Sequence, residues 1–269
     1  MSRRNSCLTA VLMLAALSAC QQQPPPPEGI YPAPDTSFVG RRLQQRLGTE
    51  QADVAVVFIG GFSEQVLTHL RRVYESMPPL PTTGKQVRAF YAWDGGRGCL
   101  LFHSTALIQR DLRAFLQANP GADLVLIGHS YGGSACMDVL RHLNHPHGRT
   151  VVVTLDAVSC RKRSYPRERA TGIDYWLNVY CAPYRHFKDM AAAVGGPWRE
   201  CPQADLNISF SGKNRDRADR RYQHAQPLPL FEDRAPGQIY SAYEHMVSAC
   251  NRLQIGEPRR APRINPTPK

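Results

Sequence analysis

One stretch of the chain, residues 124–133, limits the possible fold more than any other. It reads LVLIGHSYGG. The apolar residues 124–127 predict a buried strand, and the residues after position 130 are compatible with a helix. Gly128 and Gly132 flank Ser130, as expected if a strained turn crowds the residues on either side of it. The stretch therefore predicts a strand, a sharp turn that carries Ser130, and a helix.

The remaining hydrophobic runs alternate between the pattern of a buried strand and that of an amphipathic helix. We expect strands at residues 54–59, 86–93, 123–127, 150–155, 175–180 and 206–210, and helices at 66–77, 105–119, 131–143, 185–194 and 239–253. Strands that alternate with helices favour an α/β fold with a mostly parallel sheet of about six strands and helices on both faces. One domain is expected over residues 38–255.

The first nineteen residues are typical of a signal peptide. Two arginines precede an apolar run at residues 8–17, which is too short to span a bilayer comfortably. The sequence LSAC then resembles the lipobox of bacterial lipoproteins. That resemblance implies cleavage before Cys20 and acylation of its thiol, while an ordinary secretory signal is the alternative. Gln21, in place of Asp, implies a membrane-anchored lipoprotein of the outer membrane that faces the periplasm.

The segments at both ends of the expected domain are rich in proline. Residues 20–37 cannot bury a core and are expected to form a semi-rigid tether. Residues 256–269 are expected to be a frayed basic tail. The formal net charge is +11. In an exported protein this charge favours contact with anionic lipid headgroups or an envelope polymer, and not with nucleic acid.

Six cysteines follow Cys20, and an even number in an oxidising compartment suggests disulfides. They are Cys99, Cys136, Cys160, Cys181, Cys201 and Cys250. Cys136 lies on the buried face of a predicted helix, where a thiol is the alternative. Cys160, Cys181 and Cys201 are the favoured bridge formers, and the pairing is left open.

The strand, the Gly-x-Ser-x-Gly turn and the helix resemble the nucleophile elbow of the α/β-hydrolase superfamily, which includes serine esterases and lipases. The resemblance covers residues 53–253. It implies that the strand before Gly60 and the strand before Gly128 are neighbours in the sheet. The first two antiparallel strands of that fold are not obvious in residues 38–48. The short segment after Asp156 leaves no room for a large cap domain.

A serine hydroxyl needs a base within hydrogen-bond distance and a third group that orients this base. In α/β-hydrolases the order along the chain is serine, acid, histidine. Ser130, Asp156 and His224 follow that order, and each comes after a predicted strand. We therefore predict that they form a catalytic triad.

Alternatives exist for two of the three positions. In the superfamily the acid more often follows the next strand, where Asp189 is the rival and Asp174 is the weaker candidate. His245, within the predicted last helix, is the alternative base. His129 lies inside the elbow and is expected to point away from the nucleophile.

Hydrolysis of an acyl group also requires two donors for the developing oxyanion. By the family pattern these are the backbone N–H of Tyr131 and that of Phe62, with Ser63 or Gly61 as alternatives to Phe62. No metal or organic cofactor is expected. The cluster His142, His145 and His147 is interpreted as surface histidines in a loop, not as a metal site.

Two basic runs, at residues 161–169 and 213–221, follow predicted strands and could lie at the rim of the site, where they would attract an anionic substrate or headgroup. The sequence thus predicts a lipid-anchored serine hydrolase that cleaves a carboxyl ester, with a lipid ester or thioester as variants. The alternative is a non-catalytic envelope-binding lipoprotein with the same fold and a basic rim.

Overall fold

A computed structural model of the chain describes most of the predicted domain. The described residues are 45–61, 64, 68–92, 105–144, 147–159, 168–181, 196–210 and 222–257. The predicted signal peptide, Cys20 and the tether lie outside them, as do Cys99, Cys160 and the helix expected at 185–194. In the described part, no helix is both long enough and apolar enough to cross a membrane.

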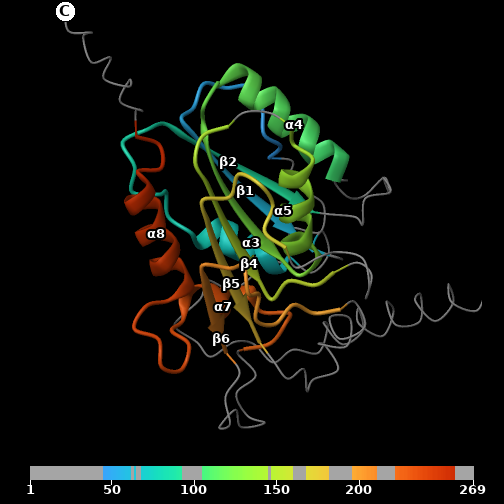
Figure 1. Cartoon of the computed structure of the whole chain (residues 1–269), viewed down its shortest axis with the longest axis vertical. Helices are drawn as coiled ribbons and strands as arrows, with labels where there is room; N and C mark the ends of the chain where they lie inside the picture. The colour runs from blue at the N-terminus through green and yellow to red at the C-terminus, as the bar shows by residue number, and fades with distance from the viewer. Residues whose placement is uncertain are drawn as a thin grey trace, which may run out of the picture. The chain divides into compact units, whose positions relative to one another are not determined.

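The centre of the domain is a six-stranded sheet in the order β2-β1-β3-β4-β5-β6, in which every neighbouring pair is parallel (Figure 1). The strands are β1 (Val54–Gly60), β2 (Gln86–Ala92), β3 (Asp123–His129), β4 (Thr150–Leu155), β5 (Tyr175–Tyr180) and β6 (Leu206–Ser209). Every residue of β1, β3 and β4 is buried. Such strands are covered on both faces, which explains their continuous apolar sequences.

Helices cover both faces of this sheet. They are α3 (His69–Ser76), α4 (Thr105–Ala118), α5 (Tyr131–Arg141), α7 (Pro227–Glu232) and α8 (Ala242–Leu253). The helices α4 and α5 pack together on one face, and α3, α7 and α8 lie on the other (Figure 1). The predicted α/β fold with a parallel sheet of six strands and helices on both faces is confirmed, including the adjacency of β1 and β3. The described part of the connection from β4 to β5 contains no further domain.

Three helices differ from the prediction. Helix α3 begins at His69 and not at 66, and its N-cap residue Thr68 is not helical. Helix α8 begins at Ala242 and not at 239, because Ser241 and Glu244 form a capping box. Ile239 lies before the helix and is exposed. Helix α7 lies in a segment for which no helix was expected. It contains Pro227 and Pro229. Both prolines lie in its first turn, where a backbone N–H has no partner within the helix.

The disulfides expected from the cysteine count are not found among the described residues. Cys136 and Cys250 are buried thiols. Cys181, at the end of β5, donates its S–H to Asp156, and Cys201 donates to the carbonyl of Arg199. The expected bridges of Cys181 and Cys201 are therefore not shown, and Cys99 and Cys160, two of the six expected bridge formers, lie outside the described residues. These cysteines are used as small buried polar groups, a role that the count could not reveal.

Aspartates connect the strands at the amino-terminal edge of the sheet. Each accepts a hydrogen bond from the backbone N–H at the start of a neighbouring strand: Asp53 from Lys85 (2.8 Å), Asp123 from Arg149 (2.6 Å), Asp174 from Thr150 (2.7 Å) and Asp205 from Trp176 (2.7 Å). Asp174, the weaker candidate for the catalytic acid, therefore has a structural role at the opposite end of the strands from Asp156.

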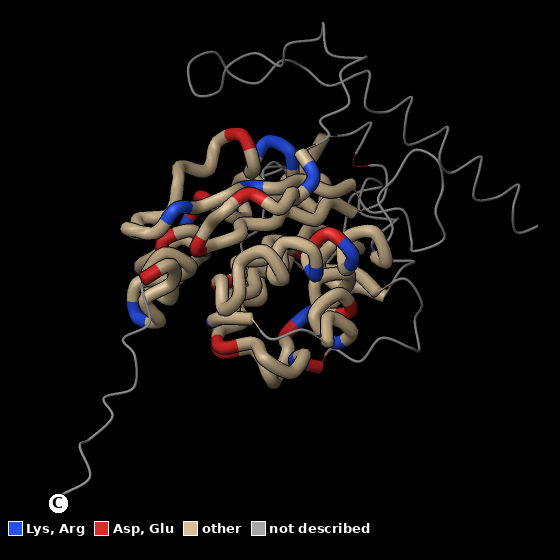
Figure 2. Tube along the Cα trace, turned by 90° about the horizontal axis from the view of Figure 1, so that it is seen from above, with Lys and Arg blue, Asp and Glu red and all other residues tan. Residues whose placement is uncertain are grey.

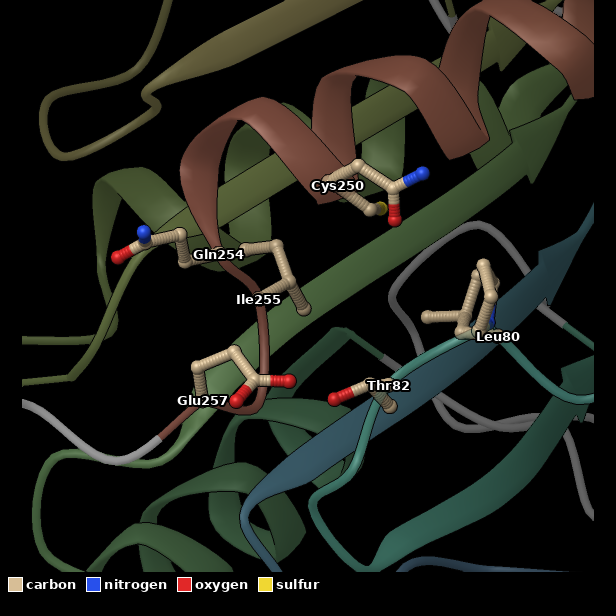
Figure 3. Close-up of a pocket in the computed structure, with 8 residues that line it drawn as sticks. Leu80, Thr82, Cys250, Gln254, Ile255 and Glu257 are labelled. Atoms are coloured by element: carbon tan, nitrogen blue, oxygen red, sulfur yellow. The ribbon is translucent and has the colours of Figure 1, made fainter.

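The C-terminal segment is attached to this amino-terminal edge. The carboxylate of Asp123 accepts from the Arg149 guanidinium at 2.7 Å and from the N–H of Gly256 at 2.6 Å. Arg149 also donates to the carbonyl of Leu253. The first residues of the predicted tail are thus held by the domain. A pocket of about 120 Å³ lies beside them (Figure 3). Figure 3 labels Leu80, Thr82, Cys250, Gln254, Ile255 and Glu257 among the residues that line it.

Basic and acidic residues of the described part alternate along the Cα trace, without a segment of one sign alone (Figure 2). Most of the two basic runs expected at a rim fall outside these residues. Within them, Arg169 forms an ion pair with Asp205 at 2.9 Å, next to the amino end of β6. This arginine therefore belongs to the amino-terminal edge and not to a rim above the carboxyl ends of the strands.

Candidate active site

Ser130 alone connects the end of β3 to the start of α5. Its backbone has φ 56° and ψ −128°, a conformation that residues with a side chain rarely adopt. Its N–H donates to the carbonyl of Leu155 at 3.1 Å, and its carbonyl accepts from Gly133 and Val158, each at 3.0 Å. These three bonds keep the strained turn in place. The turn directs the serine side chain out of the sheet at the carboxyl ends of the strands.

The glycines around this turn are required by close packing. A Cβ atom on Gly132 would collide with the carbonyl of Ile59 in the neighbouring strand β1. A Cβ atom on Gly61, just after β1, would lie 2.6 Å from the Cβ of Ser130. The absence of side chains therefore lets the loop after β1 approach the serine directly.

The structure brings Ser130, His224 and Asp156 together in one chain of hydrogen bonds. The Ser130 hydroxyl lies 2.8 Å from Nε2 of His224, and Nδ1 of His224 lies 2.7 Å from Oδ2 of Asp156. The carboxylate can only accept, so Nδ1 carries the proton and Nε2 is free to accept from the serine. Only 6%, 7% and 0% of Ser130, His224 and Asp156, respectively, is exposed. A base oriented in this way can take the serine proton.

Asp156 is held by the next strand as well as by the histidine. It has a positive φ of 44° directly after β4. Oδ1 accepts the backbone N–H of Cys181 at 2.9 Å, and Oδ2 accepts its S–H at 3.2 Å. Sequence reasoning missed this role of Cys181. The position directly after β5 was the available signal, because parallel neighbouring strands end at the same edge.

His129 contacts the backbone of the same histidine. Its Nε2 lies 2.7 Å from the carbonyl oxygen of His224, and the two ring centroids are 5.1 Å apart. Burial lowers the pKa of His129 well below its usual value, so its ring is neutral. Nδ1 of His129 is buried and has no hydrogen-bond partner among the described residues. The sequence analysis predicted that His129 lies in the elbow, but it did not predict the contact with His224.

The expected oxyanion donors are described only in part. Tyr131, the first residue of α5, follows Ser130 directly, so its backbone N–H belongs to the amino terminus of a helix beside the nucleophile. Gly61 lies against Ser130. Phe62 and Ser63 lie outside the described residues.

Glu64 is a buried carboxyl group in a helical segment three residues after Gly61, and sequence reasoning missed it. Its Oε1 accepts the N–H groups of Leu70 at 2.7 Å and of Arg71 at 3.0 Å. It therefore caps α3, whose N-cap residue Thr68 makes no side-chain cap bond. Desolvation by burial raises the pKa of Glu64 to about 8. Glu64 thus connects the segment that follows Gly61, beside Ser130, to helix α3.

The other candidates lie elsewhere. His245 is on α8 with its ring against Tyr240, at a centroid distance of 5.5 Å, while His224 is the histidine bonded to Ser130. His142 bonds its own helix at the carbonyl of Asp138. No group of three possible metal ligands occurs among the described residues. Asp189 and His145 lie outside them.

Comparisons with known proteins add little to this geometry. No family model matches the chain, and no curated protein does. The chain resembles the crystal structure of ClbQ from the colibactin NRPS/PKS pathway, with 10% identity and a TM-score of 0.36, over 74% of this chain and 96% of that one. A similarity of this size does not bear on activity or substrate.

Proposed function

We propose that the protein is a serine hydrolase that cleaves acyl substrates through an acyl-enzyme on Ser130. One observation carries the proposal: Ser130, His224 and Asp156 are linked at 2.8 and 2.7 Å, with the serine on a strained turn between β3 and α5. A strained positive-φ serine bonded to an oriented imidazole is the arrangement that nucleophilic catalysis needs.

The reaction would proceed in two halves. The Ser130 oxygen attacks the carbonyl carbon, and its proton passes to Nε2 of His224 while Asp156 stabilises the imidazolium. The N–H of Tyr131 and a donor in the loop after β1 stabilise the oxyanion. His224 then gives its proton to the leaving alcohol or thiol. Water attacks the acyl-enzyme in the same way, which releases the acid and restores the serine.

The substrate class and the location come from the sequence. A carboxyl ester is the first choice of substrate, with a lipid ester or a thioester as variants. The mechanism requires no metal or organic cofactor. The lipobox-like LSAC supports acylation at Cys20 and attachment to the outer membrane, with the domain facing the periplasm. The basic loops would then meet anionic headgroups or an envelope polymer.

The proposal is tested on the full chain in detergent with a panel of p-nitrophenyl esters and an acyl thioester of matched chain length. We expect hydrolysis of esters by the wild type and loss of activity in Ser130→Ala. Ser134→Ala is the matched control, because Ser134 lies one turn further along α5 and donates only to the carbonyl of Tyr131. Salt-sensitive binding to anionic vesicles without any hydrolysis would instead support the non-catalytic lipoprotein.

A further inference from the structure

We propose that His129 is a positioning residue that fixes the backbone of the base, His224, to the strand that carries the nucleophile. The proposal rests on the serine hydrolase function proposed above. Two consecutive residues, His129 and Ser130, contact the two ends of His224: one its main-chain carbonyl and the other its ring. The sequence separates His129 from His224 by 95 positions.

The direction of the hydrogen bond follows from its acceptor. A carbonyl oxygen can only accept, so Nε2 of His129 must carry the ring proton at its distance of 2.7 Å. This leaves Nδ1 of His129 as a bare acceptor, which is buried without a partner in the part of the chain that the structure describes. Burying an unpaired nitrogen costs free energy, so packing alone would favour an apolar side chain here. The N–H donor therefore accounts for a histidine at this position.

The neutral charge of the His129 ring is also compatible with a position next to the base, His224. During the reaction His224 becomes an imidazolium, with its ring 5.1 Å from that of His129. A second cation at this distance would oppose that charge. Burial disfavours the protonated form of His129, and the neighbouring rings of His224 and of His69, with centroids at 5.1 and 6.0 Å, disfavour it further. His129 can thus donate a hydrogen bond without repelling the protonated base.

The position of His224 in the fold explains why such an attachment matters. His224 lies in a turn, outside the helices and strands. No strand ladder fixes its main chain, whereas His129 is the last residue of the wholly buried strand β3. The bond to His129 places the carbonyl of His224 relative to Ser130, and Asp156 then sets the rotation of the ring. Small displacements of a catalytic group can reduce the rate by about 100-fold.

The test compares two variants of similar shape, His129→Gln and His129→Met. Glutamine can place an amide N–H near the position of Nε2, and methionine fills a similar volume without a donor. We expect His129→Met to lower kcat for a p-nitrophenyl ester by about 10- to 100-fold with KM within about twofold. His129→Gln should recover most of this loss. His142→Leu, at the exposed end of α5, is the control and should match the wild type.

A second readout does not depend on activity. The proton between Nδ1 of His224 and Asp156 should give a strongly low-field NMR signal in the wild type. The signal should persist in His129→Gln and broaden or vanish in His129→Met. His129→Phe replaces His129→Met as the donorless variant if thermal unfolding shows that the latter does not fold.

The outcomes separate the two proposals. Absence of hydrolysis in the wild type would contradict the proposed function, and the low-field signal would still decide the role of His129. A donorless variant with wild-type kcat and an unchanged low-field signal would overturn the positioning role.

Discussion

The two ends of the parallel sheet use the same residue type for different purposes. At the amino-terminal edge, Asp123 accepts from the guanidinium of Arg149, which remains charged at any physiological pH. At the carboxyl edge, Asp156 accepts from His224, which can gain and lose a proton. Both carboxylates are buried and both also accept a backbone N–H. The partner, and not the aspartate, distinguishes a structural pair from a candidate catalytic one.

Backbone strain differs in the same way. Ser130 and Asp156, at the carboxyl edge, both have a positive φ, whereas the aspartates of the amino-terminal edge do not. The amino-terminal edge thus contributes stability, and the carboxyl edge holds strained residues that the surrounding structure keeps in place. Variants at the amino-terminal edge should therefore lower the stability of the protein, and variants at the carboxyl edge should lower its activity.

The largest effect is expected at the base. His224→Ala should lower kcat by about 10⁴-fold or more, because the serine loses its proton acceptor. His245→Ala should leave kcat within about twofold of the wild type. Ester hydrolysis by the two purified variants decides between the histidines. A large loss in His245→Ala with an active His224→Ala would reverse the assignment.

At the opposite edge, Asp123→Ala should lower the free energy of unfolding by about 3–5 kcal/mol, because it leaves the mostly buried Arg149 guanidinium without its anion. The protein that remains folded should keep its kcat. Asp53→Ala is the matched control, since the exposed Asp53 makes the same type of bond to Lys85 and should lose at most about 1 kcal/mol. Urea unfolding measures the free energy of unfolding of both variants. Equal losses in Asp123→Ala and Asp53→Ala would contradict the stabilising role of the buried Asp123–Arg149 pair.

The raised pKa of Glu64 leads us to expect that the stability of the protein depends on pH. Burial raises the pKa of its carboxyl to about 8 from 4.5, so the folded state holds this proton more tightly than the unfolded state. This contribution is complete below about pH 4.5 and is lost as the pH rises to about 8. The melting temperature of the wild type should therefore fall over this range more steeply than that of Glu64→Gln, which imitates the neutral form. Parallel curves for the two proteins would rule out the effect.

The smallest effect is expected at Cys181. Cys181→Ala removes the S–H donor to Asp156 but keeps the backbone N–H, so kcat should fall only about three- to tenfold. Cys181→Ser supplies a hydroxyl donor and should lose less. Steady-state kinetics of the two variants test this, with Cys250→Ala as a control because Cys250 lies on α8 and lines the pocket beside the amino-terminal edge. A loss in Cys181→Ser as large as in Cys181→Ala would exclude the hydrogen bond as the cause.

The sequence was sufficient to predict the features that depend on a local residue pattern, namely the strands and the turn at Ser130. The apolar runs identified all six strands, and the glycines around Ser130 identified the turn, because close packing there leaves few alternatives. The order of Ser130, Asp156 and His224 was enough to propose a triad that the structure brings together.

The contacts that support these residues could not be predicted in the same way. The bond from His129 to His224 and the bonds from Cys181 to Asp156 join distant parts of the chain through sheet order and loop geometry. The cysteine count could not place the individual thiols for a related reason. It contains no information on whether a thiol faces another cysteine or, as for Cys181, a carboxylate.

The central claim is that Ser130 is an activated nucleophile at the carboxyl edge. The most direct test treats the intact protein with a fluorophosphonate probe and locates the adduct by mass spectrometry of peptides. A single adduct on Ser130, absent in His224→Ala and retained in Asp53→Ala, is the predicted result. No adduct on the wild-type protein, or an adduct on a residue other than Ser130, would contradict the account.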